Sequence, residues 1–126
     1  MNASEEIIRL VLADDDSLMR EGIRAILSEA SDIQIVGEAH DGFKAQQLTA
    51  QLRPRILLLD WQMPGPRPPE VVRFVRMHCP ATSVLVLTGY DRDAYLAEMI
   101  DAGAAGFLIK NEAIASRLIE AIRRAA

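Results

Sequence analysis

Ile56-Leu57-Leu58-Leu59-Asp60 is the stretch of sequence that decides the fold of this chain. Four consecutive apolar residues indicate a β-strand that is buried on both faces of a parallel sheet. The strand stops at Asp60, and the segment 61–69 that follows contains four prolines, which predicts a stiff loop. The chain therefore has a central buried strand with a carboxylate at its carboxyl end.

Three further apolar runs also end on polar side chains. They are Ile7–Ala13 before Asp14-Asp15-Asp16, Val84–Leu87 before Thr88, and Phe107–Ile109 before Lys110. In an open parallel α/β sheet, ligands bind at the carboxyl ends of the strands. We therefore expect a carboxylate cluster, a hydroxyl and an ammonium to meet at one edge of the sheet.

Strand-like and helix-like segments alternate five times along the chain. We expect strands over about 7–13, 33–36, 56–59, 83–88 and 105–109, and helices over about 17–30, 43–52, 70–78, 92–102 and 112–124. This alternation predicts an α/β fold of the flavodoxin-like type, a single five-stranded parallel sheet with helices on both faces. We expect the strand order 2-1-3-4-5, which places Asp14, Asp15 and Asp60 on neighbouring strands.

The composition indicates one soluble globular domain, because 126 residues with 50% hydrophobic and 25% charged side chains can bury a core. The single cysteine, Cys79, excludes an internal disulfide and suits a reducing cytosol. The first six residues include two glutamates, Glu5 and Glu6, where a signal peptide carries basic residues. No apolar run approaches the ~20 residues of a membrane helix. We expect a cytoplasmic protein without a membrane partner.

The net charge of −4 argues against binding of nucleic acid by this chain alone, since DNA binding needs a basic footprint that neutralises phosphates. Arg117, Arg123 and Arg124 do gather near the C-terminus. Cations at the C-terminus of a helix offset its dipole, and we assign these arginines that role.

Carboxylates that lie together repel one another unless a cation neutralises them. The oxygens of Asp14, Asp15 and Asp60 suit Mg²⁺ (or Mn²⁺), which binds few protein carboxylates and keeps waters and phosphate oxygens. Asp60, at the end of the central strand, is placed to act as a carboxylate nucleophile and become an acyl phosphate. Lys110 and Thr88 would then contact two further phosphoryl oxygens.

The strand ends carry four motifs in combination: Leu12-Ala13-Asp14-Asp15, Leu58-Leu59-Asp60-Trp61-Gln62-Met63-Pro64-Gly65, Leu87-Thr88-Gly89 and Gly106-Phe107-Leu108-Ile109-Lys110. Together they resemble the receiver domain of bacterial two-component response regulators, from about residue 7 to the end of the chain. Two stretches, 9–22 and 35–42, resemble the LuxR-type (NarL/FixJ) subgroup in particular.

The resemblance implies that Asp60 accepts a phosphoryl group from a phosphohistidine on a sensor histidine kinase. It implies that Asp15 and Asp60 ligate Mg²⁺, that Asp14 holds a metal-bound water, and that the backbone carbonyl of Gln62 completes the protein ligands. Thr88 and Lys110 would move toward the phosphoryl oxygens and reshape the face made by the fourth helix, the fifth strand and the fifth helix.

Some residues depart from the pattern of the receiver family or tune it. Pro68 stands where the family commonly has glycine, so the loop 66–69 is expected to be stiffer or reshaped. Phe107 stands where many receivers have tyrosine, so an aromatic switch here lacks a hydroxyl. Gln62 and Tyr90 lie two residues beyond Asp60 and Thr88; they either set the lifetime of the acyl phosphate or simply fill the surface.

We expect residues 1–126 to form one receiver domain, with its core at about 7–124 and no output domain in this chain. The LuxR-type resemblance implies a C-terminal helix-turn-helix that is not in this chain, and DNA would be bound only through that domain. It also implies a homodimer on phosphorylation. The chain is then a fragment of a transcription factor or a stand-alone receiver.

Other functions fit the sequence less well. One alternative that stays open is a degenerate receiver that signals without phosphate, although all the residues for the phosphoryl chemistry are present. A haloacid-dehalogenase-type phosphatase needs a second carboxylate where Gln62 stands. A flavin or dinucleotide domain needs a glycine-rich loop where Asp14-Asp15-Asp16 stands. We therefore expect a regulatory protein that catalyses only its own phosphotransfer and autodephosphorylation.

Overall fold

The computed structural model describes residues 6–89, 93–111 and 113–126. Five strands and five helices alternate within these residues, as the sequence predicts. They are β1 (Ile8–Ala13), α1 (Ser17–Leu27), β2 (Ile33–Ala39), α2 (Gly42–Leu52), β3 (Ile56–Asp60), α3 (Pro68–His78), β4 (Ser83–Thr88), α4 (Asp93–Ala102), β5 (Gly106–Ile109) and α5 (Ile114–Ala125).

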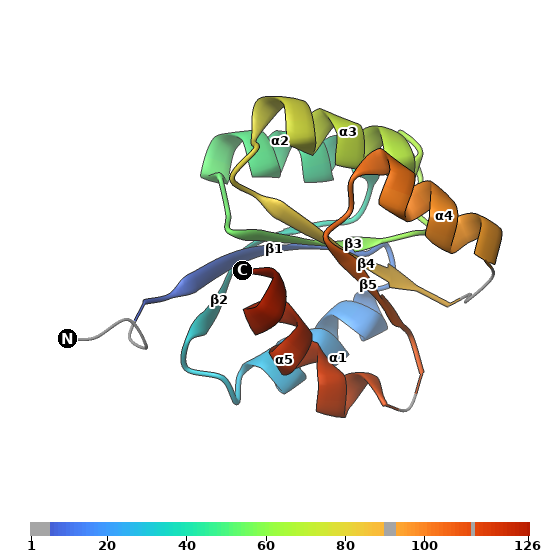
Figure 1. Cartoon of the computed structure of the whole chain (residues 1–126). Helices are drawn as coiled ribbons and strands as arrows, with labels where there is room; N and C mark the ends of the chain where they lie inside the picture. The colour runs from blue at the N-terminus through green and yellow to red at the C-terminus, as the bar shows by residue number, and fades with distance from the viewer. Residues whose placement is uncertain (1–5, 90–92, 112) are drawn as a thin grey trace.

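The strands form one parallel sheet in the order β2-β1-β3-β4-β5, which confirms the predicted order. Helices α2, α3 and α4 cover one face of the sheet, and α1 and α5 cover the other (Figure 1). Every residue of the central strand β3 is buried. Leu57 and Leu59 belong to the hydrophobic cluster on one face, and Ile56 and Leu58 to the cluster on the other. The continuous apolar run in the sequence is therefore the signature of burial on both faces.

Strand β2 extends three residues beyond the predicted end, to Ala39. Its ladder with β1 is irregular, since Leu10 pairs with Ile35 while Val11 pairs with Gly37. Pairing then continues to the end of β1, where the Asp14 N–H donates to the Ala39 carbonyl over 3.0 Å. The extension brings the end of β2 to the edge of the sheet where the acidic residues lie.

Helix α3 begins at Pro68, two residues before the predicted start. The sequence interpretation placed Pro68 and Pro69 in a loop, whereas they occupy the first two helical positions. An N–H at these positions would have no partner within the helix, so the missing donors cost nothing there. Helices α1 and α5 also differ from the predictions, because α1 ends at Leu27 and α5 begins at Ile114.

The loop after Asp60 is held against the start of α2. The Gly42 N–H donates to the Pro64 carbonyl over 2.9 Å. Gly65 has a φ of +95°, and a Cβ there would lie 3.2 Å from Cδ2 of Phe43. The turn therefore requires glycine at position 65, both for its backbone conformation and for the close approach of α2.

Within the described residues, no helix combines the length and the apolar character that crossing a membrane requires.

Candidate functional site

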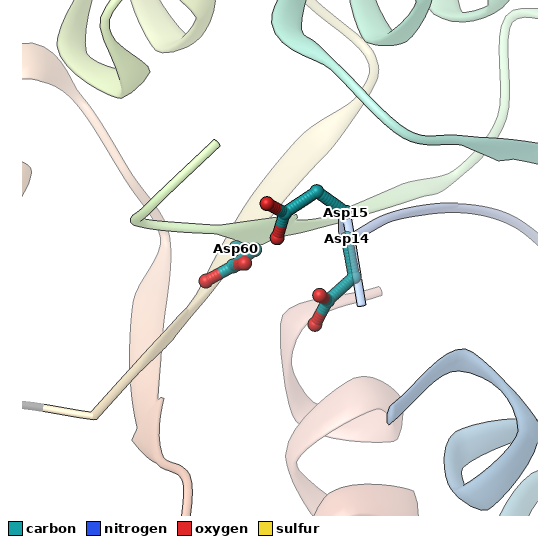
Figure 2. Close-up of side chains that lie close together, drawn as sticks. All are labelled: Asp14, Asp15 and Asp60. Carbon is teal, nitrogen blue, oxygen red and sulfur yellow. The ribbon is translucent and has the colours of Figure 1, made fainter. Parts of the chain in front are cut away.

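Three carboxylates lie together at the carboxyl edge of the sheet. Asp14 and Asp15 follow β1 directly, and Asp60 is the last residue of β3, so both strands deliver acidic groups to the same place (Figure 2). One oxygen from each of the three side chains lies within 4.8 Å of the other two. Asp14 is fully buried and Asp60 is 4% exposed, whereas Asp15 is exposed. The predicted acidic cluster therefore exists, and it opens to solvent on the side of Asp15.

Lys110 joins this cluster from β5. Its Nζ lies 2.9 Å from Oδ2 of Asp14 and 3.1 Å from Oδ1 of Asp60. The backbone of Lys110 is held by β4, because its N–H donates to the Thr88 carbonyl over 2.7 Å. One ammonium thus faces the two buried carboxylates.

The burial of these charges changes their protonation. Burial raises the pKa of Asp60 to about 6; the charge of Asp14 also raises it, while Lys110 and the Gln62 N–H oppose the rise. Burial lowers the pKa of Lys110, but the hydrogen bond to Asp14 and the charge of Asp60 outweigh it and leave that pKa raised. Lys110 is therefore charged at neutral pH. It balances one of the three negative charges, so the site favours a further cation.

Backbone groups orient the two buried carboxylates. Oδ1 of Asp14 accepts from the Asp16 N–H over 2.9 Å, and Oδ1 of Asp60 accepts from the Gln62 N–H over 3.2 Å. The Trp61 N–H donates to the Leu87 carbonyl over 2.8 Å, which ties the residue after Asp60 to β4. The two buried carboxylates, Asp14 and Asp60, are thus each oriented by a backbone N–H two residues further along the chain.

The other predicted site residues differ in burial and in their contact with this cluster. Thr88 is buried at the end of β4, the strand beside β3. The Gln62 side chain is exposed, and only its backbone N–H contacts Asp60. Phe107 is 38% exposed on β5. Tyr90 lies outside the described residues.

Sequence reasoning missed one residue beside the cluster, Arg20. Its Nη1 donates to the backbone carbonyl of Asp14 over 2.6 Å, and its Nε lies 3.3 Å from Oε1 of Glu38. A signal was present in the sequence, because Arg20 lies one helical turn after the acidic run. The partner Glu38, however, lies beyond the predicted end of β2.

The donor set fits a divalent cation. Three carboxylates supply the hard oxygens that Mg²⁺ and Mn²⁺ prefer. The nearby lysine leaves a net negative charge on the group, and Asp15 is exposed to solvent. The arrangement can hold a cation beside a buried carboxylate nucleophile.

Residues 10–123 match the response regulator receiver domain family. The fold, the acidic cluster and the lysine agree with this match, and the chain belongs to the response regulator receiver family. The family and the fold predicted from the sequence motifs are therefore confirmed.

Named relatives agree with this assignment. The chain is 38% identical over 123 residues to YxjL of Bacillus subtilis, an uncharacterised transcriptional regulatory protein, covering 98% of this chain and 56% of the relative. The chain thus spans about half the length of the curated relatives that it matches.

Solved structures show the same fold. The signal receiver domain of NarL from Mycobacterium tuberculosis has a TM-score of 0.85 and 35% identity, covering 94% of this chain and 98% of that chain. A two-component response regulator of the LuxR family from Aurantimonas sp. SI85-9A1 has a TM-score of 0.87 and 29% identity, covering 94% and 84%. The chain is therefore similar to receivers of LuxR-family regulators, as the two subgroup motifs predict.

Proposed function

We propose that this receiver is a phosphorylation-dependent switch in which Asp60 accepts a phosphoryl group from the phosphohistidine of a sensor histidine kinase. The observation that carries the proposal is the position of Lys110, whose ammonium lies 2.9 Å from Asp14 and 3.1 Å from Asp60 within a three-carboxylate cluster. A buried carboxylate that is paired with an ammonium group, as Asp60 is with Lys110, is placed for nucleophilic attack.

The cation site would be formed by Asp15 and Asp60 as side-chain ligands and by the Gln62 carbonyl. Asp14 would hold a water on the cation, a role supported by its full burial and its contacts with Lys110 and the Asp16 N–H. When bound, Mg²⁺ or Mn²⁺ neutralises the charge that develops on the transferring phosphoryl group.

In the transfer, an Asp60 oxygen forms a bond to phosphorus while the bond from phosphorus to the histidine nitrogen breaks. The electron pair of the broken bond stays on the imidazole. Lys110 then exchanges its contact with Asp60 for one with a phosphoryl oxygen, and the Thr88 hydroxyl donates to another. Thr88 is the last residue of β4 and Lys110 directly follows β5, so their movement would reshape the face made by α4, β5 and α5.

The output proposed for this switch is transcription. The relatives are transcriptional regulatory proteins about twice as long as this chain. A helix-turn-helix domain outside these residues would contact DNA, and phosphorylation would favour a homodimer. With a net charge of −4, the receiver itself is unsuited to binding DNA phosphates.

Intact mass spectrometry after incubation with Mg²⁺ and a small acyl phosphate tests the proposal, with Asp60→Asn as the comparison. We expect one phosphoryl adduct on the unmodified chain, dependent on Mg²⁺ and absent from Asp60→Asn. An adduct that persists in the variant would reassign the acceptor. No adduct under any condition would instead indicate a receiver that signals without phosphate, with the segment 66–69 as the first place to examine.

Gln62 and Tyr90 are proposed to set the lifetime of the acyl phosphate by ordering or shielding the attacking water. The exposure of the Gln62 side chain one residue beyond Trp61 supports this role for Gln62. The test is the dephosphorylation rate of a Gln62→Ala, Tyr90→Ala double variant, measured as the loss of the phosphoryl adduct over time. A rate equal to that of the unmodified chain would reject the role.

A further inference from the structure

Arg20 connects three elements next to the acidic cluster. It lies in the first turn of α1, and its Nη1 donates to the Asp14 carbonyl over 2.6 Å. That carbonyl belongs to the peptide unit that joins Asp14 to Asp15. The guanidinium therefore holds the backbone between two of the three clustered carboxylates.

Glu38 holds the same guanidinium from β2. Its Oε1 lies 3.3 Å from Nε of Arg20, and it also accepts from Nη1 of Arg24, one helical turn further along α1. Arg24 contacts Glu38 but has no contact with the Asp14–Asp15 peptide in the described part of the chain. The two arginines thus share an acceptor and a helix face, and they differ in whether they reach the acidic loop.

Asp15 depends on its backbone for its position. The Asp14 carboxylate is fixed by Lys110 and by the Asp16 N–H. The Asp15 carboxylate, by contrast, is exposed and makes no hydrogen bond or ion pair within the residues that the structure describes. Rotation of the Asp14–Asp15 peptide would redirect this side chain, and the hydrogen bond from Arg20 opposes that rotation.

We infer that Arg20 is a positioning residue for the divalent-cation site. Its hydrogen bond fixes the Asp14–Asp15 peptide, so that the Asp15 carboxylate stays beside Asp60. Glu38 in turn holds the Arg20 guanidinium in place. This inference rests on the proposed function, in which the acidic cluster binds Mg²⁺. Groups that orient the ligands of a metal typically contribute 10- to 100-fold to metal affinity.

The sign of the effect separates positioning from simple electrostatics. Arg20 carries a positive charge beside a site for a cation, so the loss of its charge alone would strengthen Mg²⁺ binding. The loss of its hydrogen bond to Asp14 would instead weaken binding. The change in the Mg²⁺ dissociation constant therefore reports which role dominates.

Titration with Mg²⁺ followed by the fluorescence of Trp61 provides the test, because Trp61 is the single tryptophan and directly follows Asp60. We expect Arg20→Met to raise the Mg²⁺ dissociation constant by about tenfold or more. The matched control Arg24→Met, which removes a charge from the same helix and the same acceptor, is expected to leave it unchanged or slightly lower. Arg20→Lys keeps a donor and is expected to recover part of the loss.

An Arg20→Met variant that binds Mg²⁺ as well as Arg24→Met, or better, overturns the inference. Urea unfolding of each variant shows whether it is folded. If Arg20→Met does not fold, Arg20→Lys takes its place: it keeps the charge but lacks the planar guanidinium that reaches both Glu38 and the Asp14 carbonyl, and it is expected to weaken Mg²⁺ binding in part. Absence of saturable Mg²⁺ binding in the unmodified chain overturns the proposed cation site and the inference with it, an outcome that is distinct from failure of the inference alone.

Discussion

The ammonium of Lys110 lies 3.1 Å from Oδ1 of Asp60, although β4 separates their strands in the sheet. The side chain of Lys110 thus reaches across the carboxyl end of β4 to the end of β3. A phosphoryl group on Asp60 would compete for the Lys110 ammonium. Phosphorylation at the end of β3 would therefore change the contacts at the end of β5. This contact links the proposed acceptor directly to the end of β5.

Replacement of Lys110 is expected to destabilise the metal-free protein. In Lys110→Met, two buried carboxylates lose the cation that they share. Because the site is open to solvent at Asp15, we expect a loss of about 1–3 kcal/mol, below the ~3–5 kcal/mol of a fully buried pair. Urea unfolding in EDTA measures the loss, and saturating Mg²⁺ should recover much of it. The chain's other lysine, the exposed Lys44, provides the control: Lys44→Met should change little, and equal losses in the two variants would contradict the argument.

Neutralising Asp60 is expected to have the opposite effect on stability. Burial raises the pKa of Asp60 to about 6, from an ordinary value of 3.8. Its ionisation therefore costs stability above pH 6, costs progressively less as the pH falls from 6 to 3.8, and costs nothing below 3.8. At pH 7.5 without divalent cations, Asp60→Asn should be more stable than the unmodified chain, by at most about 3 kcal/mol.

Urea unfolding across this pH range checks the prediction for Asp60. The gap between Asp60→Asn and the unmodified chain should close toward pH 4. Asp101→Asn, at an exposed position on α4, should show no such gap. A gap for Asp60→Asn that persists at pH 4 would assign the stabilisation to packing and not to charge.

The sequence was sufficient to predict the sheet and most of the acidic site. Parallel strands bring their carboxyl ends to one edge, so Asp14, Asp15, Asp60 and Lys110 could be assigned to one place from their positions after apolar runs. Each of these predictions depends on a short stretch of sequence.

The features that the sequence could not predict depend on contacts between distant elements. Arg20 reaches the Asp14 carbonyl, but its anchor Glu38 lies on the part of β2 that continues beyond an irregularity in the ladder. Leu18 is an apolar residue of α1, as are the buried Ile23 and Leu27, yet it is 74% exposed. It is the second residue of α1. The spacing of apolar residues indicates which face of a helix is buried, but it does not indicate where along the helix that burial ends.

The ion pair between Asp32 and Arg123 links the start of β2 to α5 and predicts a pH dependence of stability. Arg123 donates from Nε and Nη2 to the two oxygens of Asp32, over 2.9 and 2.8 Å. The hydrogen bonds from Arg123 hold the pKa of Asp32 below its ordinary value of 3.8. The stabilisation is therefore fully present above pH 3.8 and is lost as the pH falls through the lower pKa of the folded state.

Asp32→Asn is expected to lower the urea midpoint slightly at pH 7, since exposed pairs contribute little. The difference from the unmodified chain should shrink as the pH falls below 3.8 and should shrink in high salt. Arg123→Met should produce the same change, and the double variant should not add to it. Additive losses in the double variant would show that the two residues act separately.

Gly103 ends α4 in a conformation that only glycine adopts without strain. Its φ is +107°, its N–H donates to the Met99 and Ile100 carbonyls, and a Cβ there would lie 2.1 Å from Cδ of Arg76. Gly103→Ala is expected to cost about 1–2 kcal/mol for the left-handed backbone, and more where Arg76 cannot move aside. Gly22→Ala is the matched control, because a Cβ there meets nothing within 4 Å in the middle of α1, so alanine should be neutral or stabilising. Urea unfolding of both variants, and of Gly103→Ala combined with Arg76→Ala, separates backbone strain from the clash. If Gly103→Ala is as stable as Gly22→Ala, the end of α4 must rearrange freely, and the constraint ascribed to Gly103 does not exist.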